Sequence, residues 1–110
     1  MSSYRVVVTE AAERDLSALF DVIAFDFCNP QAAIQHVAEL RDAAMSLGEI
    51  PERSPLYRIP MFANLGIREM SVKKFKVIYQ VLNNPKMVIV LAVVGERRDL
   101  ATVLSARTLL

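Results

Sequence analysis

The sequence predicts an α+β fold in the order β-α-α-β-β-β, in which a two-helix hairpin packs on a twisted antiparallel sheet. Apolar residues recur every three or four positions in the first half of the chain, which is typical of amphipathic helices. Alternating and β-branched runs fill the second half, which is typical of strands. With 110 residues, the chain is expected to form a single domain over residues 1–110.

The first strand is expected at residues 4–8, a short run rich in valine. Thr9 can cap the following helix with its side-chain oxygen, and Glu10 lies in the first turn, where the helix dipole favours an anion. The apolar stripe that continues from there predicts a helix over residues 10–27.

Asn29 and Pro30 mark the start of a second helix, because asparagine is a good N-cap and proline needs no N–H at the first helical position. The apolar stripe of this helix runs to Leu47, and Gly48 is expected to end it in a left-handed backbone conformation. Two residues separate the helices, so the helices must fold back into a hairpin. We favour packing of this hairpin on the sheet over dimerisation through its heptad-like stripe.

Three prolines make residues 49–65 a connecting loop in which no regular element is expected. Three strand-like runs follow the loop, at residues 67–72, 75–82 and 87–94. Residues 83–86 (Asn-Asn-Pro-Lys) are a turn signal that makes the last two runs a hairpin. The last run is apolar on both faces, which predicts a central strand, and residues 100–110 fit either a short helix or a loose tail.

Charge is unevenly distributed along the chain, although the net charge is only +1. Residues 1–66 hold 5 Lys/Arg and 9 Asp/Glu, whereas residues 67–110 hold 8 Lys/Arg and 3 Asp/Glu, so the two parts carry −4 and +5. This split indicates a basic face directed at a nucleic acid or an acidic protein. The alternative is that the lysines only protect exposed strand edges from pairing with other sheets.

Several classes of function are not expected from this composition. The three glycines are isolated, which argues against a glycine-rich phosphate loop. His36 is the only histidine and Cys28 the only cysteine, so we expect neither a metal site nor a disulfide, and no cofactor. The longest apolar run, residues 87–94, is far shorter than the roughly 20 residues of a membrane span. With no visible signal peptide, the expected compartment is the cytoplasm.

The remaining candidate chemistry is basic and lies in the strand half. Strand alternation puts Lys76 on the face opposite Phe75 and Tyr79. Arg97 and Arg98 directly follow the last strand. If Lys76 and these arginines converge, they can hold a phosphate by charge-assisted hydrogen bonds.

The order of motifs resembles the ParE/RelE toxins of type II toxin–antitoxin systems. The strand half matches a glycine-x-arginine strand, then an aromatic-x-valine-x-tyrosine strand, and then a last strand that ends in basic residues and often aspartate. The front half agrees through paired alanines before an Asp-Leu pair, and through an Asn-Pro-x-Ala-Ala helix start. The matching segments are Ala11-Ala12, Asp15-Leu16, residues 29–33, Gly66-Ile67-Arg68, residues 75–79 and Val93-Val94-Gly95-Glu96-Arg97-Arg98-Asp99-Leu100.

This resemblance implies a fold like that of the microbial ribonucleases and a toxin that a cognate acidic antitoxin of the ParD/RelB kind neutralises in a hetero-oligomer. The DNA operator is then contacted only through the antitoxin. The resemblance implies one of two targets. RelE-like members are mRNA endonucleases that act in the ribosome with basic residues and a late tyrosine or histidine. ParE-like members lack that set and inhibit DNA gyrase.

The resemblance carries Lys76 and Arg97 onto basic catalytic positions of the RelE branch, where this chain would be an enzyme. The late tyrosine or histidine is missing, since no tyrosine follows Tyr79 and the register points to Val103. Gyrase inhibition is therefore favoured over RNA cleavage. A nontoxic binding module with the same fold is a third interpretation.

Six residues are candidates for binding the target or the antitoxin. They are Arg68, Lys73, Lys74, Tyr79, Arg97 and Arg98. Structural alternatives stay open for some of these positions: Tyr79 is also compatible with a core aromatic whose hydroxyl is hydrogen-bonded, and the arginines with docking of the antitoxin alone.

Overall fold

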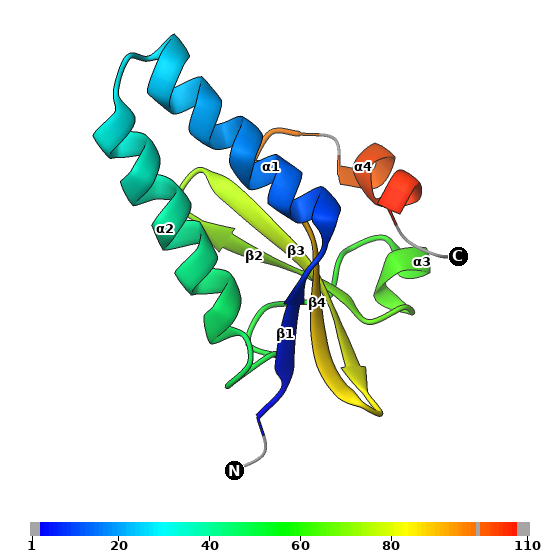
Figure 1. Ribbon diagram of the computed structural model, residues 1–110. Helices are drawn as coiled ribbons and strands as arrows, with labels where there is room; N and C mark the ends of the chain where they lie inside the picture. The colour runs from blue at the N-terminus through cyan, green and yellow to red at the C-terminus, as the bar shows by residue number, and fades with distance from the viewer. Residues whose placement is uncertain (1–2, 99, 108–110) are drawn as a thin grey trace.

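The computed structural model describes residues 3–98 and 100–107 of the chain. Its elements in chain order are β1 (Arg5–Val8), α1 (Glu10–Asp21), the π-helical turn η1 (Val22–Asp26), α2 (Pro30–Ser46), α3 (Pro60–Ala63), β2 (Ile67–Val72), β3 (Phe75–Asn83), β4 (Lys86–Gly95) and α4 (Leu100–Arg107). The hairpin of α1, η1 and α2 covers one face of a four-stranded sheet, and α3 and α4 pack on the other face (Figure 1). The predicted fold class is confirmed.

The sheet has the strand order β1-β4-β3-β2, so β4 is a central strand, as predicted. β3 pairs antiparallel with both β2 and β4, whereas β1 pairs in parallel with β4, from Arg5 opposite Met87 to Val8 opposite Val90. The sheet is therefore mixed, which refines the expected antiparallel arrangement. Residue alternation could not reveal this, because a strand buries the same side chains whichever way its neighbour runs.

The first helix begins as predicted and ends differently. Thr9 Oγ1 accepts a hydrogen bond from the backbone N–H of Ala12 at 3.2 Å, which caps α1. The helix does not continue in α form to Phe27, because residues 22–26 form the π-helical turn. Cys28 then adopts φ 53°, an uncommon conformation for a residue with a side chain, and the chain reverses into α2.

The second helix also begins as predicted, since Asn29 Oδ1 accepts from the N–H of Ala32 at 3.1 Å and Pro30 occupies the first turn. The expectation that Gly48 adopts a left-handed backbone conformation is wrong. Among the described glycines, positive φ is found at Gly66 instead. A Cβ at Gly48 would lie 2.8 Å from the carbonyl oxygen of Tyr4. Glycine is thus required by the close approach of β1 to the end of α2, where the N–H of Tyr4 donates to the Gly48 carbonyl at 2.8 Å.

The predicted loop over residues 49–65 contains one helical turn, α3, which corrects the expectation that it holds no regular element. Pro60 occupies the first turn of α3, where its missing N–H has no cost. The loop also covers the outer edge of β2: the N–H of Tyr57 donates to the carbonyl of Ile67 at 2.8 Å. This edge is therefore partly closed to other strands.

Two apolar cores lie on opposite faces of the sheet. The hairpin-side core contains Ala12, Leu16, Leu40, Ala44, Leu47, Val77, Tyr79, Val88, Val90 and Val93. The second core contains Tyr57, Phe62, Ile67, Ile78, Leu91, Ala92, Val94 and Leu104. Because β4 contributes to both, its predicted burial on both faces is confirmed. Of the two possibilities for residues 100–110, the helix is formed over Leu100–Arg107, and residues 108–110 lie outside the described part. None of the helices in residues 3–98 and 100–107 has the length and apolarity that crossing a membrane would require.

Candidate functional site

Lys76, Arg97 and Arg98 line one cavity of about 240 Å³, which we call the basic cavity. Its other lining residues are Tyr57, Arg58, Glu69 and Glu96. Lys76 lies near the start of β3 opposite Val94, near the end of the antiparallel strand β4, and the two arginines follow that end. The expected convergence of these three cations is therefore confirmed. Four cationic side chains outnumber two carboxylates, so the cavity is suited to an anionic group.

Lys76 forms an ion pair with Glu69, in which Nζ lies 3.0 Å from Oε1. In the β2–β3 register Glu69 lies opposite Ile78, so Lys76 is its diagonal neighbour on the same face of the sheet. Both side chains are 25% exposed, so the pair is neither buried nor free in solvent. Glu69 thereby holds the ammonium group at the cavity and adds a potential proton acceptor to it.

Arg97 and Arg98 are exposed in the turn beyond Gly95. The turn is held by two backbone hydrogen bonds, from Arg98 N to the Gly95 carbonyl at 3.1 Å and from Glu96 N to the Lys74 carbonyl at 2.9 Å. Neither guanidinium forms an ion pair within the described part of the chain. Asp99, the next residue of the sequence pattern, lies outside the described residues.

Arg68 lies apart from the residues that line the basic cavity. Its guanidinium donates to the carbonyl of Ser54 at 2.6 Å and lies 3.4 Å from Glu52, and its side chain is 17% exposed. These contacts tie the connecting loop to β2. A structural role is therefore visible for Arg68, and its predicted contact with a partner stays a prediction.

Tyr79 is fully buried in the hairpin-side core, on the sheet face opposite Lys76, as strand alternation predicts. Its hydroxyl donates to the carbonyl of Pro51 at 2.8 Å. The side chain does not reach the surface of the molecule. Its position corrects the expectation that Tyr79 contacts a partner, and it matches the alternative of a core aromatic with a hydrogen-bonded hydroxyl.

Lys73 and Lys74 are exposed in the turn between β2 and β3 and line a different cavity, of about 470 Å³, beside the helical hairpin. Lys73 has φ 55° and its Nζ lies 2.7 Å from Glu39 Oε2 of α2. This hydrogen bond lowers the pKa of the Glu39 carboxyl. The six candidate residues therefore fall into separate regions of the molecule.

Histidine and cysteine chemistry lies away from the basic cavity. His36 lines the cavity beside the hairpin, and Cys28 is exposed at the turn between the helices. Within residues 3–98 and 100–107, no group of three or more His, Cys, Asp or Glu side chains is arranged to hold a metal ion. The basic cavity therefore offers cations, two carboxylates and the Tyr57 phenol as its functional groups.

The residues that sequence reasoning missed at this site are Tyr57, Arg58, Glu69 and Glu96. The sequence offers a signal for two of them. Glu96 is the neighbour of Arg97, and Glu69 follows Arg68 in β2, so the two side chains lie on opposite faces of the strand. The loop residues Tyr57 and Arg58 carry no comparable signal, because their position depends on how the loop folds back over β2.

Residues 6–100 match the family described as the ParE toxin of type II toxin-antitoxin system, parDE. This match defines the class of the protein, a toxin of the ParE/RelE superfamily from type II toxin–antitoxin systems. Because the match spans most of the sequence, the chain belongs to this family. No curated protein sequence matches the chain.

Solved structures with the same fold come from both branches of the superfamily. The chromosomal ParDE system of P. aeruginosa matches with a TM-score of 0.71 and 18% identity, over 84% of this chain and 96% of that chain. The RelBE2 toxin–antitoxin complex of Mycobacterium tuberculosis matches with a TM-score of 0.64 and 21% identity, over 84% of this chain and 98% of that chain. An arginine-to-alanine double mutant of the E. coli toxin RelE in the free state matches with a TM-score of 0.59 and 18% identity, over 94% of this chain and 92% of that chain. At these identities the similarity shows the shared fold.

Proposed function

We propose that this protein inhibits DNA gyrase in the manner of the ParE branch, acts in the cytoplasm and is neutralised by a cognate acidic antitoxin. One observation carries the choice of target: within the described residues, the basic cavity holds no side chain whose ordinary pKa lies near neutrality. The match of residues 6–100 to the ParE family supports the same choice.

RNA cleavage requires a base to take the proton of the 2′-hydroxyl and an acid to protonate the leaving oxygen. The one histidine of the sequence, His36, lines the other cavity, and Tyr79 is buried with its hydroxyl engaged. Val103, at the position where the resemblance expects a late tyrosine or histidine, packs against the second core. The cations of the cavity are then better suited to binding an acidic surface than to moving a proton.

The proposal is tested by offering the purified protein both targets in parallel. We expect inhibition of supercoiling by gyrase and intact mRNA in a translating extract. The variant with Arg97→Ala and Arg98→Ala serves as the control and should lose the inhibition. Codon-specific cleavage of mRNA, with supercoiling unaffected, would reverse the assignment.

The alternative function, ribosome-dependent RNA cleavage, is favoured by the Glu69 carboxylate beside Lys76 in the same cavity as the two arginines. There Glu69 would act as the base, and the cations would stabilise the charge that develops on the phosphate. Glu69→Gln separates the two functions, because it removes the base but keeps the size and polarity of the side chain. Cleavage would fall by about 10²-fold or more if Glu69 is the base, whereas gyrase inhibition requires no proton acceptor at this position.

Toxicity itself is tested by expression in a bacterial host. We expect the chain alone to arrest growth and the co-expressed product of the neighbouring reading frame to restore it by forming a hetero-oligomer. Normal growth with verified folded protein would instead support the nontoxic binding module.

A further inference from the structure

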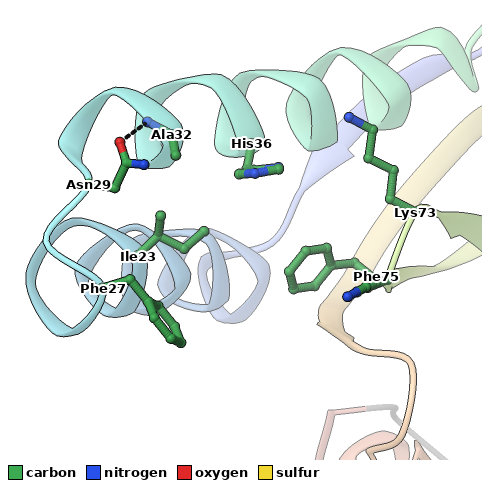
Figure 2. A pocket seen from close by; sticks show the side chains of 8 residues that line it. Ile23, Phe27, Asn29, Ala32, His36, Lys73 and Phe75 are labelled. Carbon is green, nitrogen blue, oxygen red and sulfur yellow. Dashed lines mark hydrogen bonds between the residues drawn. The ribbon is translucent and has the colours of Figure 1, made fainter.

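The helical hairpin and the β2–β3 turn enclose a groove with two distinct ends. We call it the hairpin groove, and its volume is about 470 Å³. In Figure 2, Phe27 and Asn29 lie at one end, where the helical hairpin reverses. Lys73 and Phe75 approach the other end, which we call the turn end, and His36 projects from α2 between the two ends.

Apolar side chains are exposed where the helices reverse, a segment that we call the hairpin tip (residues 21–29). Val22, Phe25 and Phe27 are 42%, 71% and 72% exposed, and Phe27 lines the groove. The two phenylalanines are the most exposed large apolar side chains in the described part of the chain. Exposed aromatic surface of this kind is typical of a site that binds another protein.

The two ends of the groove carry opposite charge. The turn end supplies two cations, Lys73 and Lys74, and Lys74 forms no ion pair with any described residue. At the hairpin tip, Asp21 and Asp26 are exposed and likewise form no ion pair within the described residues. Residues 15–40 contain no lysine or arginine. The tip is therefore acidic and apolar, whereas the turn end is basic and apolar.

We propose that this surface binds a second copy of the chain, related by a two-fold axis that crosses the groove between its two ends. A two-fold rotation exchanges the ends, so the tip of each copy meets the turn end of the other. Phe27 of each copy then packs over the partner's Phe75, and Asp26 lies close to the partner's Lys74. Both contacts occur twice, and each joins complementary groups.

A second copy fits both ends of this surface, whereas an acidic segment of another protein fits one. Carboxylates are attracted to Lys74 but are repelled by Asp21 and Asp26 at the tip. An uncharged apolar partner would cover the phenylalanines and leave the charges at both ends without partners. The opposite charges of the two ends therefore favour a symmetrical contact.

The proposed dimer leaves the basic cavity open. None of the residues that line the cavity also lines the groove. The boundary lies within β3, where Phe75 lines the groove and Lys76, the next residue, lines the cavity on the other face of the sheet. The inference depends neither on the choice of gyrase as target nor on an antitoxin, so it can be tested whether or not the protein is toxic.

Exchange of charge between the two ends tests the contact directly. Lys74→Glu places a carboxylate opposite the partner's Asp26, and Asp26→Lys places a cation opposite the partner's Lys74, so either change makes the contact repulsive. In the double variant the charges have exchanged places and attraction returns. An equimolar mixture of the two single variants should also associate, because both contacts of the mixed dimer join opposite charges.

The apolar part of the contact has its own variant and control. Phe27→Ser removes an exposed aromatic from the groove, and Ile50→Ser removes a side chain that is 60% exposed in the connecting loop. Lys86→Glu is the control for charge reversal, since Lys86 is exposed at the start of β4, away from the groove. Sedimentation velocity of the full-length protein over a range of concentrations gives the dimer Kd, and the melting temperature verifies folding.

We expect the wild type to show a concentration-dependent dimer. Phe27→Ser, Lys74→Glu and Asp26→Lys should each raise its Kd by about tenfold or more, as for central residues of an interface. The double variant and the mixture should return to within about threefold of the wild-type Kd, and both controls should stay within the same range.

Four results would overturn the proposal. A wild type that stays monomeric at every concentration would exclude the dimer. A dimer that persists in all three single variants would place the interface elsewhere. Weakened single variants without recovery in the mixture would show that Asp26 and Lys74 do not meet between copies. Unchanged self-association of Phe27→Ser, together with a loss of toxicity or of antitoxin binding, would assign the surface to the target or the antitoxin.

Discussion

At the scale of single residues, the hydroxyl of Tyr79 joins the sheet to the connecting loop. It donates to the carbonyl of Pro51 within the hairpin-side core, 28 positions earlier in the sequence. The ring itself is fully buried. The polar end of Tyr79 therefore links the loop to β3, in addition to the contacts that Arg68 and Ile67 of β2 make with the loop.

Tyr79→Phe should destabilise the protein by about 1–3 kcal/mol, because it leaves a buried carbonyl without its donor. Toxicity and antitoxin affinity should stay unchanged after correction for the folded fraction. Tyr4→Phe is the matched control: it removes an exposed hydrogen bond to Asn83 Oδ1 and should cost about 0.5 kcal/mol or less. The measurement is urea unfolding. Full stability of Tyr79→Phe together with lost binding would return Tyr79 to the interaction surface.

Asp15 and Arg107 form a second residue-scale link, between α1 and α4. The guanidinium contacts both carboxylate oxygens, at 2.5 and 2.9 Å, and also donates to the carbonyl of Leu91 at 3.1 Å. Asp15 Oδ2 also accepts from the N–H of Val93 at 2.9 Å. The hydrogen bond to Asp15 raises the pKa of Arg107. The pair therefore secures α4 against the part of β4 that extends beyond β1.

A double-mutant cycle measures this link. Arg107→Gln and Asp15→Asn should each cost about 1–3 kcal/mol, and their coupling free energy should be about 1 kcal/mol or more, because the side chains are mostly shielded from solvent. Glu13→Gln breaks the more exposed pair with Arg41 and should cost no more than about 1 kcal/mol. A coupling near zero would mean that α4 is held by its apolar contacts alone.

At the scale of elements, the junction between α2 and β1 depends on the absence of a side chain at Gly48. Gly48→Ala should destabilise the fold by about 1–3 kcal/mol, because its Cβ would meet backbone atoms that cannot move independently. Gly95→Ala is the control, since a Cβ there meets nothing within 4 Å. Thermal unfolding of the two variants gives the comparison. Equal stability would show that β1 shifts away from α2 without cost.

Elements whose signals are local could be predicted from the sequence, and those set by distant contacts could not. Thr9 and Asn29 cap their helices with their own side chains, so both helix starts were predictable. The parallel pairing of β1 involves residues about 80 positions away and leaves no local signature. The π-helical turn and the single turn of α3 likewise depend on how the chain packs.

The same distinction applies to the candidate site. Lys76 was predictable because strand alternation determines its face of the sheet. The two arginines were predictable because they directly follow the end of β4. The same alternation placed Tyr79 on the opposite face, but its burial was only one of the two possibilities that the sequence left open. Tyr57 reaches the cavity only because the loop folds over β2, which no periodicity predicts.

At the scale of the whole molecule, we expect the positive charge of the basic cavity to be dispensable for folding. The combined Arg97→Ala and Arg98→Ala variant should lose toxicity while its stability changes by no more than about 0.5 kcal/mol. Lys76→Ala should weaken toxicity in the same direction. Its cost in stability is expected to be somewhat larger, because Glu69 loses its partner.

Growth arrest, the melting temperature and the antitoxin Kd should be measured together on these variants. A toxic double variant that loses only antitoxin binding would make the arginines a docking site for the antitoxin. A variant that unfolds would give them a structural role.

The pairing of β1 with β4 also determines when the protein can exist in folded form. β4 is the last strand to be synthesised, yet it lies between β3 and β1 and contributes to both cores. A nascent chain that ends before β4 has no neighbour for β1 and no partner for β3 on that side. Because non-local pairing must wait for the distant segment, folding should occur late and cooperatively. The cell would then meet the toxin only as a completed molecule, after β4 has been synthesised.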